Sequence, residues 1–349
     1  MKLSDFDYHL PTGLIAQRPK RPRHDSRLLV LDKKTGQIGH DFFFNLLKYL
    51  KPSDVLVFND SKVIPARLFG WKETGGKIQL LLTRDLGAGR WQAVLGGFKE
   101  KELGKEIIFE EPSAFPLPKE KPLCAQPEKF LGDGLWEIRF NLAGTALKKK
   151  INELGQTPLP PYIKQEADLR QYQTLYAKNE GSAAAPTAGL HFSGKILSDL
   201  KKRNIQTEFV TLHVGLGTFL PVKTENLEEH KMHSEAAQID EATARRLNEY
   251  KKEGRRIIAV GTTSARTLEG FADEKGLIQS GLKELDIFIT PGYEFKVVRG
   301  LITNFHLPKS TLLMLICALA GREKVFKAYN QAIQKNYRFY SFGDAMLIL

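Results

Sequence analysis

RIIAVGTTSARTLEGF, residues 256–271, joins a short apolar run to a helix-forming segment through one glycine. Arg256–Val260 predicts a buried strand that ends at Gly261, and Thr262–Phe271 predicts the helix that follows. Free backbone N–H groups at a helix start, with hydroxyl groups beside them, bind anions or polar ligand groups. A threonine-capped helix with a surface arginine fits the same pattern, so the sequence leaves both interpretations open.

The alternation of strand and helix continues on both sides of this unit, which predicts an α/β layer architecture. Gly254 and Gly321 stand where helices are expected to end, and Ser310 stands where one is expected to begin. The expected elements are a helix over Asp240–Glu253, a strand over Asp286–Thr290 and helices over Thr311–Ala320 and near Glu323–Lys335.

The first half of the chain has a different sequence pattern. From about Pro65 to Asn141, short apolar stretches alternate with glycine turns, which predicts an antiparallel barrel or sandwich. The prolines of residues 110–130 exclude a helix over most of that segment. The elements expected here are a helix over Phe42–Leu50 and strands over Val55–Phe58, Ala66–Trp71, Lys77–Thr83, Trp91–Leu95, Glu106–Phe109 and Leu135–Phe140. We therefore expect a discontinuous α/β domain, residues 1–64 and 152–349, interrupted by an all-β domain, residues 65–151.

Composition limits the class of protein. The chain has 349 residues, which fits roughly two domains, and its hydrophobic content of 42% can supply a core. Two cysteines in no metal-like spacing, a polar N-terminus and a longest apolar run of only Leu312–Ala320 predict a cytoplasmic protein without a membrane span. The net charge of +12 suggests a polyanionic partner such as RNA, although a generally basic protein gives the same number.

Two glycine-rich blocks each carry a histidine: EGSAAAPTAGLHF at 180–192 and TLHVGLGTFLPV at 211–222. Glycine lets a backbone approach a ligand closely, and histidine can transfer a proton near neutral pH. We expect the blocks to form two walls of one small-molecule pocket, with His191 and His213 as candidate acid and base. Either histidine taken alone also fits a structural role. The other candidates in these blocks are Thr187, Gly189, Gly215 and Gly217.

Other polar residues follow expected strands or lie in loops, where active sites of α/β proteins commonly form. A structural role stays open for each group. The candidates are Asn59, Asp60, Lys62 and Arg67 after the first strand, His233 and Glu235 as an acid–base pair, Thr262, Thr263 and Arg266 at the quoted helix, and Asn304 and His306 before the helix at 311–320. No metal-ligand spacing, dinucleotide-binding glycine motif or phosphate-binding loop occurs.

Two segments suit RNA. A proline-interrupted basic arm is expected to be extended and exposed, and aromatic rings beside a cation can stack on an unpaired base. A solvated connector and an ordinary edge strand are the alternatives. The candidates are Arg18, Lys20, Arg21 and Arg23 in the arm and Tyr337, Arg338 and Tyr340 near the C-terminus.

Several long segments in addition to the two histidine blocks resemble the S-adenosylmethionine:tRNA ribosyltransferase-isomerase family, and the resemblance runs nearly end to end. Arg299 departs from that family's pattern, in which an acidic residue is usual. The matching segments are SRLLVL at 26–31, DVLVFNDSKVIPARLFG at 54–70, PLPPYI at 158–163, MHSE at 232–235, VGTTSARTLE at 260–269, FITPGYEFKVVRGLITNFHLPKSTLLML at 288–315 and YRFYSFGDAM at 337–346.

The resemblance implies a β-barrel inserted into an α/β domain and an enzyme of queuosine biosynthesis. Such an enzyme transfers and isomerises the ribosyl group of S-adenosylmethionine onto 7-aminomethyl-7-deazaguanine at the tRNA wobble position. The products are epoxyqueuosine-tRNA, adenine and methionine. S-adenosylmethionine is then a cosubstrate, no tightly bound cofactor or metal is expected, and the chain is expected to act as a monomer.

In that reaction His213 and His191 are expected to transfer protons, with Asp60 or Glu235 as substitutes. Arg266, Thr262 and Thr263 are expected to anchor the methionyl carboxylate. Two other functions stay open from the sequence: a tRNA-binding scaffold without catalysis, and a metabolic enzyme that uses S-adenosylmethionine on a small acceptor.

Overall fold

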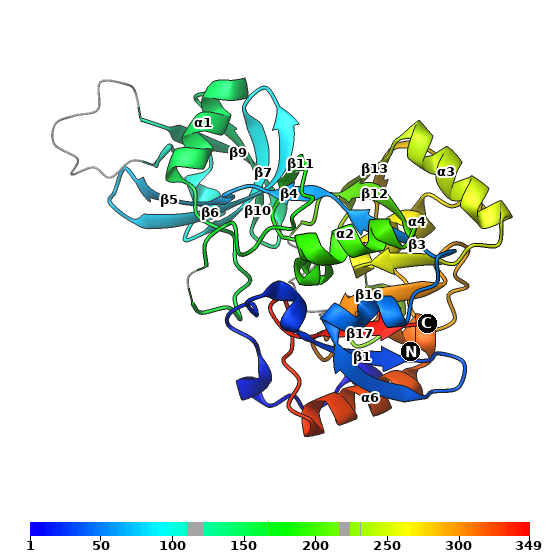
Figure 1. Cartoon of the computed structure of the whole chain (residues 1–349). Helices are drawn as coiled ribbons and strands as arrows, with labels where there is room; N and C mark the ends of the chain where they lie inside the picture. The colour runs from blue at the N-terminus through cyan, green and yellow to red at the C-terminus, as the bar shows by residue number, and fades with distance from the viewer. Residues whose placement is uncertain (110–121, 166, 216–223, 231) are drawn as a thin grey trace.

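A large mixed sheet flanked by helices and a separate small barrel make up the molecule (Figure 1). The structure, a computed structural model, describes residues 1–109, 122–165, 167–215, 224–230 and 232–349. The predicted fold class, an α/β main body with an antiparallel barrel, is confirmed. The chain division at residues 65 and 151 stays a prediction.

The main sheet has nine strands, and its four central strands run parallel. Both edges are antiparallel. In spatial order the strands are β15 (Gly281–Leu285), β13 (Glu235–Ile239), β12 (Gln206–Leu212), β3 (Val55–Asn59), β14 (Ile257–Val260), β16 (Gly300–Asn304), β17 (Ala345–Ile348), β1 (Arg27–Leu31) and β2 (Ile38–Phe42).

Helices cover both faces of this sheet, because its central strands are apolar on both sides. In β3, Val55 and Val57 belong to one core and Leu56 and Phe58 to the other. The first core takes α3 (Glu241–Lys252), α4 (Thr262–Gly270), α5 (Thr311–Ala320) and α6 (Arg322–Gln334). The second takes α2 (Gly194–Lys202) and a 3-10 helix over Phe43–Lys48.

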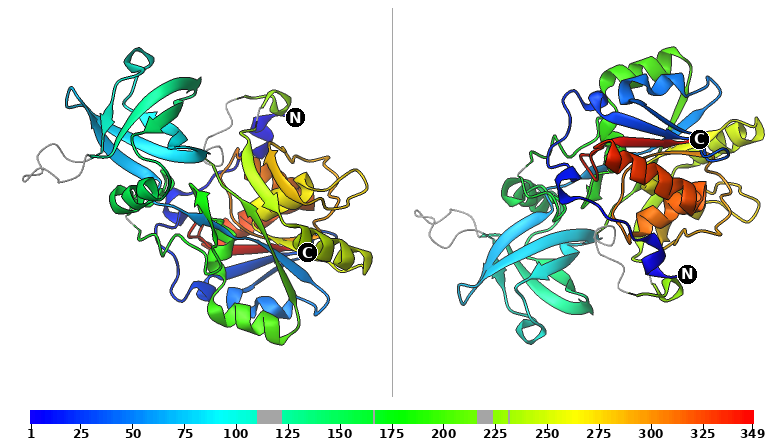
Figure 2. Two further views of the ribbon diagram at one scale, coloured as in Figure 1. Left: turned by 90° about the horizontal axis from the view of Figure 1, so that it is seen from above. Right: turned by 90° about the horizontal axis from the view of Figure 1, so that it is seen from below.

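The barrel is closed by six strands and lies to one side of the sheet (Figure 2). Leu147 and Ile151 of α1 (Gly144–Leu154) pack on its core. A parallel pair, β4 (Ser61–Val63) and β11 (Asn179–Ser182), lies outside the sheet and the barrel. The barrel strands are β5 (Arg67–Lys72), β6 (Lys77–Gly87), β7 (Arg90–Gly96), β8 (Ile107–Ile108), β9 (Cys124–Gly132) and β10 (Leu135–Phe140), in the spatial order β10–β7–β6–β5–β8–β9.

Two predictions of local structure differ from the structure, and one barrel strand was missed. The helix expected over Phe42–Leu50 is a 3-10 helix of six residues, because Phe42 still belongs to β2. The strand expected over Asp286–Thr290 is wrong: β15 ends at Leu285, where its partner β13 begins, and the apolar run beyond it packs in the core without a ladder. Strand β9 was not predicted because it contains Pro127, which lies beside a register irregularity.

The helix ends follow the predicted chemistry. Ser310 Oγ accepts from Leu313 N at 3.2 Å, and Asp240 Oδ1 accepts from Thr243 N at 2.8 Å. Both are side-chain caps of the kind that helix N-termini favour. Among the described helices, none combines the length and the hydropathy that a membrane span requires.

Candidate active site

Four parallel strands end at one edge of the main sheet, and candidate residues follow directly after each of them. Strands β3, β12, β14 and β16 end at Asn59, Leu212, Val260 and Asn304. After β3 the chain enters the barrel, and the later strands β12 and β14 pair with β3 on its two sides. This arrangement makes the edge a topological switch point. Crevices at such points bind the ligands of α/β proteins.

A hydroxyl-lined cavity of about 70 Å³ lies at this edge, at the start of α4. Uncharged side chains line it. Six of them carry polar groups from the β14–α4 turn, the end of β16 and the first histidine block: Thr187, Thr262, Thr263, Thr303, Asn304 and His306. The His306 Nε2 atom lies 2.8 Å from Thr303 Oγ1, and burial lowers the pKa of His306 to about 3. The imidazole is therefore neutral at physiological pH.

A larger barrel–sheet cleft of about 450 Å³ lies between the barrel and the edge strands of the main sheet. The barrel side contributes Arg84 and Asp85 of β6, and the sheet side contributes His213 and Glu235. An ion pair crosses this cleft, since Arg84 Nη2 lies 2.6 Å from Glu284 Oε1 of β15. None of the barrel residues was singled out from the sequence, because nothing local marks which barrel strand faces the sheet.

The two histidine blocks do not face each other across one pocket; they pair side by side and together line both the cavity and the cleft. Ala183 N donates to Val214 O at 3.0 Å, and Val214 N donates to Ser182 Oγ at 2.9 Å. Val214 lines the hydroxyl-lined cavity, whereas its neighbours His213 and Gly215 line the barrel–sheet cleft. Neighbouring residues of extended chain point to opposite sides, so the paired blocks serve both spaces.

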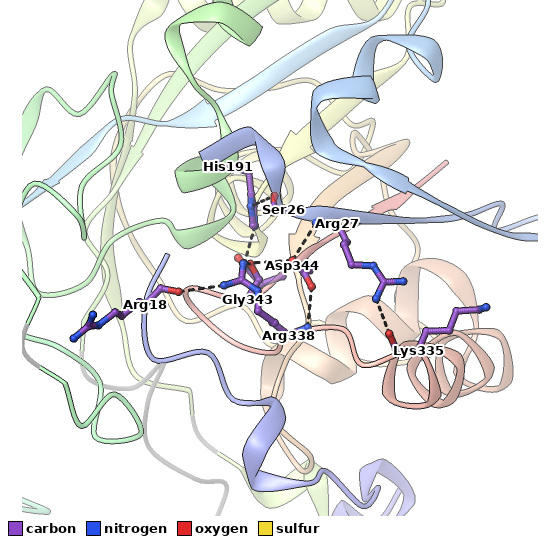
Figure 3. A network of polar contacts seen from close by, with 9 residues as sticks. Arg18, Ser26, Arg27, His191, Lys335, Arg338, Gly343 and Asp344 are labelled. Atoms are coloured by element: carbon purple, nitrogen blue, oxygen red, sulfur yellow. Dashed lines mark hydrogen bonds and ion pairs between the residues drawn. The ribbon is translucent and has the colours of Figure 1, made fainter. Parts of the chain in front are cut away.

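His191 does not reach either space, which corrects its predicted role in proton transfer. Its Nδ1 lies 2.8 Å from Ser26 Oγ and its Nε2 lies 3.1 Å from Asn304 Nδ2, so both ring nitrogens have partners (Figure 3 shows the Ser26 contact). Burial, together with the nearby charges of Arg338 and Arg23, lowers the pKa of His191 to about 3. The residue is a neutral, fully bonded core histidine.

His213 is the histidine that faces the cleft. Its Nδ1 atom is buried and has no hydrogen-bond partner among the described residues. Burial lowers the pKa of His213 below its ordinary 6.5, and the charge of Asp60 opposes that shift. The ring is therefore neutral near pH 7 and can accept a proton there.

Gly181 packs directly against the His213 ring. Its φ is +134°, and a Cβ at this position would lie 3.3 Å from two ring atoms. Replacing Gly181 with alanine is expected to lower any activity that depends on the His213 ring by about 10-fold, because a displaced side chain loses alignment with a bound substrate. Single-turnover kinetics measure this effect. Gly292→Ala is the matched control, because Gly292 has φ +102° and open space around it; equal losses in both variants would argue against a role for the ring contact.

Arg266 is paired within the protein through one nitrogen, whereas its Nε and Nη2 atoms are buried without a hydrogen-bond partner among the described residues, so its role as a carboxylate anchor stays a prediction. Its Nη1 donates to Glu235 Oε2, and both side chains are buried. Glu235 Oε1 also accepts from Gly215 N at 3.0 Å. The pair ties α4 and β13 to the second histidine block. Glu235 is thus held by a cation, and the predicted pairing with His233 on a loop is replaced by this contact.

The candidates that follow β3 hold the junction together. Asn59 exchanges hydrogen bonds with the backbone of Leu212, and Asp60 Oδ1 accepts from Thr211 Oγ1 at 2.7 Å. Asp60 opens on a third surface hollow and not on the cavity or the cleft. Lys62 pairs with Glu180 at 3.0 Å.

The remaining candidates separate into lining and packing residues. Thr187 Oγ1 donates to Asn304 Oδ1 at 2.9 Å, and both line the hydroxyl-lined cavity. Arg67 Nη2 donates to Leu159 O at 2.6 Å, a structural contact. His233 is exposed at the barrel–sheet cleft, and Gly217 lies outside the described residues. Gly189 is a packing residue, since a Cβ there would lie 1.9 Å from Tyr176 Oη.

The C-terminal aromatic residues are not available for stacking on RNA. Tyr337 is buried beneath the Arg27 guanidinium, which lies 3.7 Å from the ring centre. Tyr340 is buried against Tyr162 and lines the hydroxyl-lined cavity. Arg338 bonds to Asp344 and to the backbone of Arg18 (Figure 3). Their apolar surface serves the core, which the aromatic composition alone could not reveal.

The basic arm is exposed only in part. Arg18, Lys20 and Arg21 are exposed. Arg23 is half-buried, and its guanidinium donates to the carbonyls of Gln173 and Arg170, both at 2.7 Å. Among the described residues, no group of three or more metal-ligating side chains occurs.

A crevice at the carboxyl edge of a parallel sheet, with a barrel closing one side, defines an α/β enzyme with an accessory barrel. The chain belongs to the queuosine biosynthesis protein family, since a family model with that description matches residues 3–348. The predicted family resemblance and the prediction of an enzyme are thereby confirmed.

Curated relatives match this chain over its whole length. It is 52% identical to the S-adenosylmethionine:tRNA ribosyltransferase-isomerase of Carboxydothermus hydrogenoformans and 50% identical to that of Caldanaerobacter subterraneus subsp. tengcongensis, with 100% of each chain covered. A crystal structure of S-adenosylmethionine tRNA ribosyltransferase from Thermotoga maritima matches with a TM-score of 0.56 and 37% identity. That match covers 99% of this chain and 100% of the other.

Proposed function

We propose that this enzyme transfers and isomerises the ribosyl group of S-adenosylmethionine onto 7-aminomethyl-7-deazaguanine at the wobble position of tRNA. The products are epoxyqueuosine-tRNA, adenine and methionine. The observation that carries the proposal is a cleft of about 450 Å³ with a neutral histidine in its wall, in a chain 52% identical to an enzyme of that name. S-adenosylmethionine acts as a cosubstrate without a tightly bound cofactor, and the chain works as a monomer in the cytoplasm.

The chemistry starts at the sugar carbon beside the sulfonium, which is acidic. His213 accepts that proton, the bond from sugar to adenine breaks, and adenine leaves with a proton from a general acid. The amine of the modified base then attacks the unsaturated sugar and forms the new carbon–nitrogen bond. An oxygen of the sugar then attacks the carbon that carries sulfur; the new carbon–oxygen bond closes the epoxide as the carbon–sulfur bond breaks, and methionine leaves with the sulfur electron pair. This sequence requires one base, one acid and an anchor for the methionyl carboxylate.

The barrel–sheet cleft has the size for the reacting parts of both substrates, since small-molecule sites commonly occupy about 300–1,000 Å³. Arg84 and Asp85 line the cleft opposite His213. In this proposal the barrel contributes one side of the nucleotide site, and the discontinuous main domain, residues 1–64 and 152–349, contributes the catalytic side.

Release of free adenine tests the proposal. The full-length protein is incubated with S-adenosylmethionine and tRNA that carries the precursor base, and adenine is quantified by chromatography. Adenine release that requires the tRNA supports the proposal. Release without RNA identifies a small-acceptor enzyme instead, and no release in either mixture contradicts the proposed reaction.

The exposed end of the basic arm is expected to contact tRNA phosphates. Replacing Lys20 and Arg21 with alanine should weaken tRNA binding and lower the slope of log affinity against log salt by about 1.5–2, the loss of two phosphate contacts. Filter binding over a salt series measures that slope. Lys195→Ala with Lys201→Ala removes the same charge from exposed positions of α2 and should leave the slope unchanged. Equal slopes in the two double variants would contradict a contact by the arm.

A further inference from the structure

The hydroxyl-lined cavity is not used by the chemistry described above, and two helix N-termini meet at it. Thr262 and Thr263 are the first residues of α4, a helix of nine residues, and both line the cavity. Ser310, the N-cap of the ten-residue helix α5, lines it as well. The backbone N–H groups at a helix start carry partial positive charge and lack partners within the helix. An anion in this cavity would therefore meet two such ends.

The first backbone N–H groups of α4 have no capping side chain. The N-cap residue of α4 is Gly261, which has no side chain to accept from the first N–H groups, whereas Ser310 caps α5 with its own hydroxyl. Gly261 has φ +91°, and a Cβ there would lie 3.5 Å from Thr263 Oγ1. The glycine thus leaves both the helix start and the neighbouring hydroxyl open toward the cavity.

Thr263 provides an independent sign of a ligand. Its side chain is only 8% exposed, it lines the cavity, and its Oγ1 atom has no hydrogen-bond partner among the described residues. Buried hydroxyl groups in proteins nearly always have a partner. A bound acceptor would supply the missing one. One turn further along α4, by contrast, the Thr267 hydroxyl does have a partner, since its Oγ1 donates to Thr263 O at 2.9 Å.

The donors of this cavity fit a carboxylate attached to an aliphatic chain. The lining side chains carry no formal charge, since His306 is neutral, so the attraction comes from N–H and O–H dipoles alone. Ala184, Val214 and Leu312 provide apolar walls. Tyr340 stacks on Tyr162 with 4.6 Å between ring centres and adds an aromatic wall.

We propose that the hydroxyl-lined cavity binds the amino-acid carboxylate of the cosubstrate, through the start of α4 and the hydroxyl of Thr263. This places the methionyl anchor on backbone and hydroxyl donors, whereas Arg266 remains paired with Glu235. The inference rests on the proposed function for its choice of S-adenosylmethionine. The same chemistry would accept free L-methionine, the released product.

Calorimetric titration of the full chain without tRNA tests the carboxylate directly. The two probes are S-adenosylmethionine and decarboxylated S-adenosylmethionine, which lacks only that group. The wild type is expected to prefer the carboxylate form by about 10- to 100-fold, the range for hydrogen bonds to a charged group. Thr263→Val is expected to lower that preference by about 5- to 10-fold. Its melting temperature should not fall, because the variant removes a hydroxyl without a partner.

Thr267→Val is the matched control, because it removes a satisfied hydroxyl from the same helix and should keep the preference. Equal binding of the two probes by the wild type, or an equal loss of preference in both variants, would overturn the inference. Competition by L-methionine but not by L-methioninol would show that the subsite also takes the released product. Competition by neither would restrict it to the intact cosubstrate.

Adenine release separates the two proposals. If tRNA-dependent release occurs while the probes bind equally, only the carboxylate subsite fails. If no adenine is released while the carboxylate preference persists, the proposed reaction fails and the subsite stands.

Discussion

Replacement of His213 with alanine is expected to lower the rate of tRNA-dependent adenine release by about 100-fold or more, because a positioned general base contributes that much. The ring faces the barrel–sheet cleft, its Nδ1 is buried, and Gly181 packs against it. Single-turnover assays measure the loss. His9→Ala is the control, because His9 is exposed on the surface. Near-normal turnover of the His213 variant would reject its role as the base.

The pH profile gives a second check on the same residue. Burial lowers the pKa of His213 below 6.5, so the neutral form that accepts a proton predominates above that pKa. The rate of the base-dependent step should therefore be constant near pH 7 and fall as the pH drops through a value under 6.5. An acidic limb with its midpoint above 6.5 would contradict the assignment.

Replacement of Arg266 with methionine is expected to lower the free energy of unfolding by about 3–5 kcal/mol, because Glu235 would stay buried without its cation. Glu235 is 4% exposed and also accepts from Gly215 N. Urea denaturation followed by fluorescence measures the change. The double variant Glu235→Gln with Arg266→Met should recover at least about 1 kcal/mol of that loss, since the two residues are in contact.

The double variant distinguishes a lost ion pair from a general packing defect. A double variant as unstable as the single one would show that Arg266 acts through its packing alone. Arg245→Met is the surface control, because Arg245 is exposed on α3 and its removal should cost less than about 0.5 kcal/mol.

Much of the main-body fold could be predicted from local sequence. The strand Ile257–Val260 and the helix Thr262–Gly270 lie within one residue of the expected ends, because an apolar run, a glycine and a periodic segment mark them. The cap at Ser310 was predicted for the same reason. Strand β9 was not predicted because it contains Pro127. The pairing with β10 is irregular beside this proline, and that irregularity cannot be read from the segment itself.

The site was predicted unevenly. Thr262 and Thr263 follow a strand whose end is legible in the sequence, and they line the hydroxyl-lined cavity together with Asn304, whose strand β16 was not predicted. His191 and Arg266 carry the right chemistry but have buried partners elsewhere in the chain, and Tyr337 bonds to His40, which lies 297 residues away. No local pattern distinguishes a histidine that meets a serine 165 residues away from one that meets a substrate.

The sequence by itself determined the family, the division into an α/β body and a barrel as fold classes, and the strand, turn and helix at residues 256–271, because these depend on neighbours along the chain. Only the tertiary structure decided that the two histidine blocks pair side by side and that His213 alone of the two histidines faces the cleft. The physical reason is that burial, charge pairing and the direction of a side chain across an extended strand depend on what packs against it. Those neighbours come from distant parts of the chain.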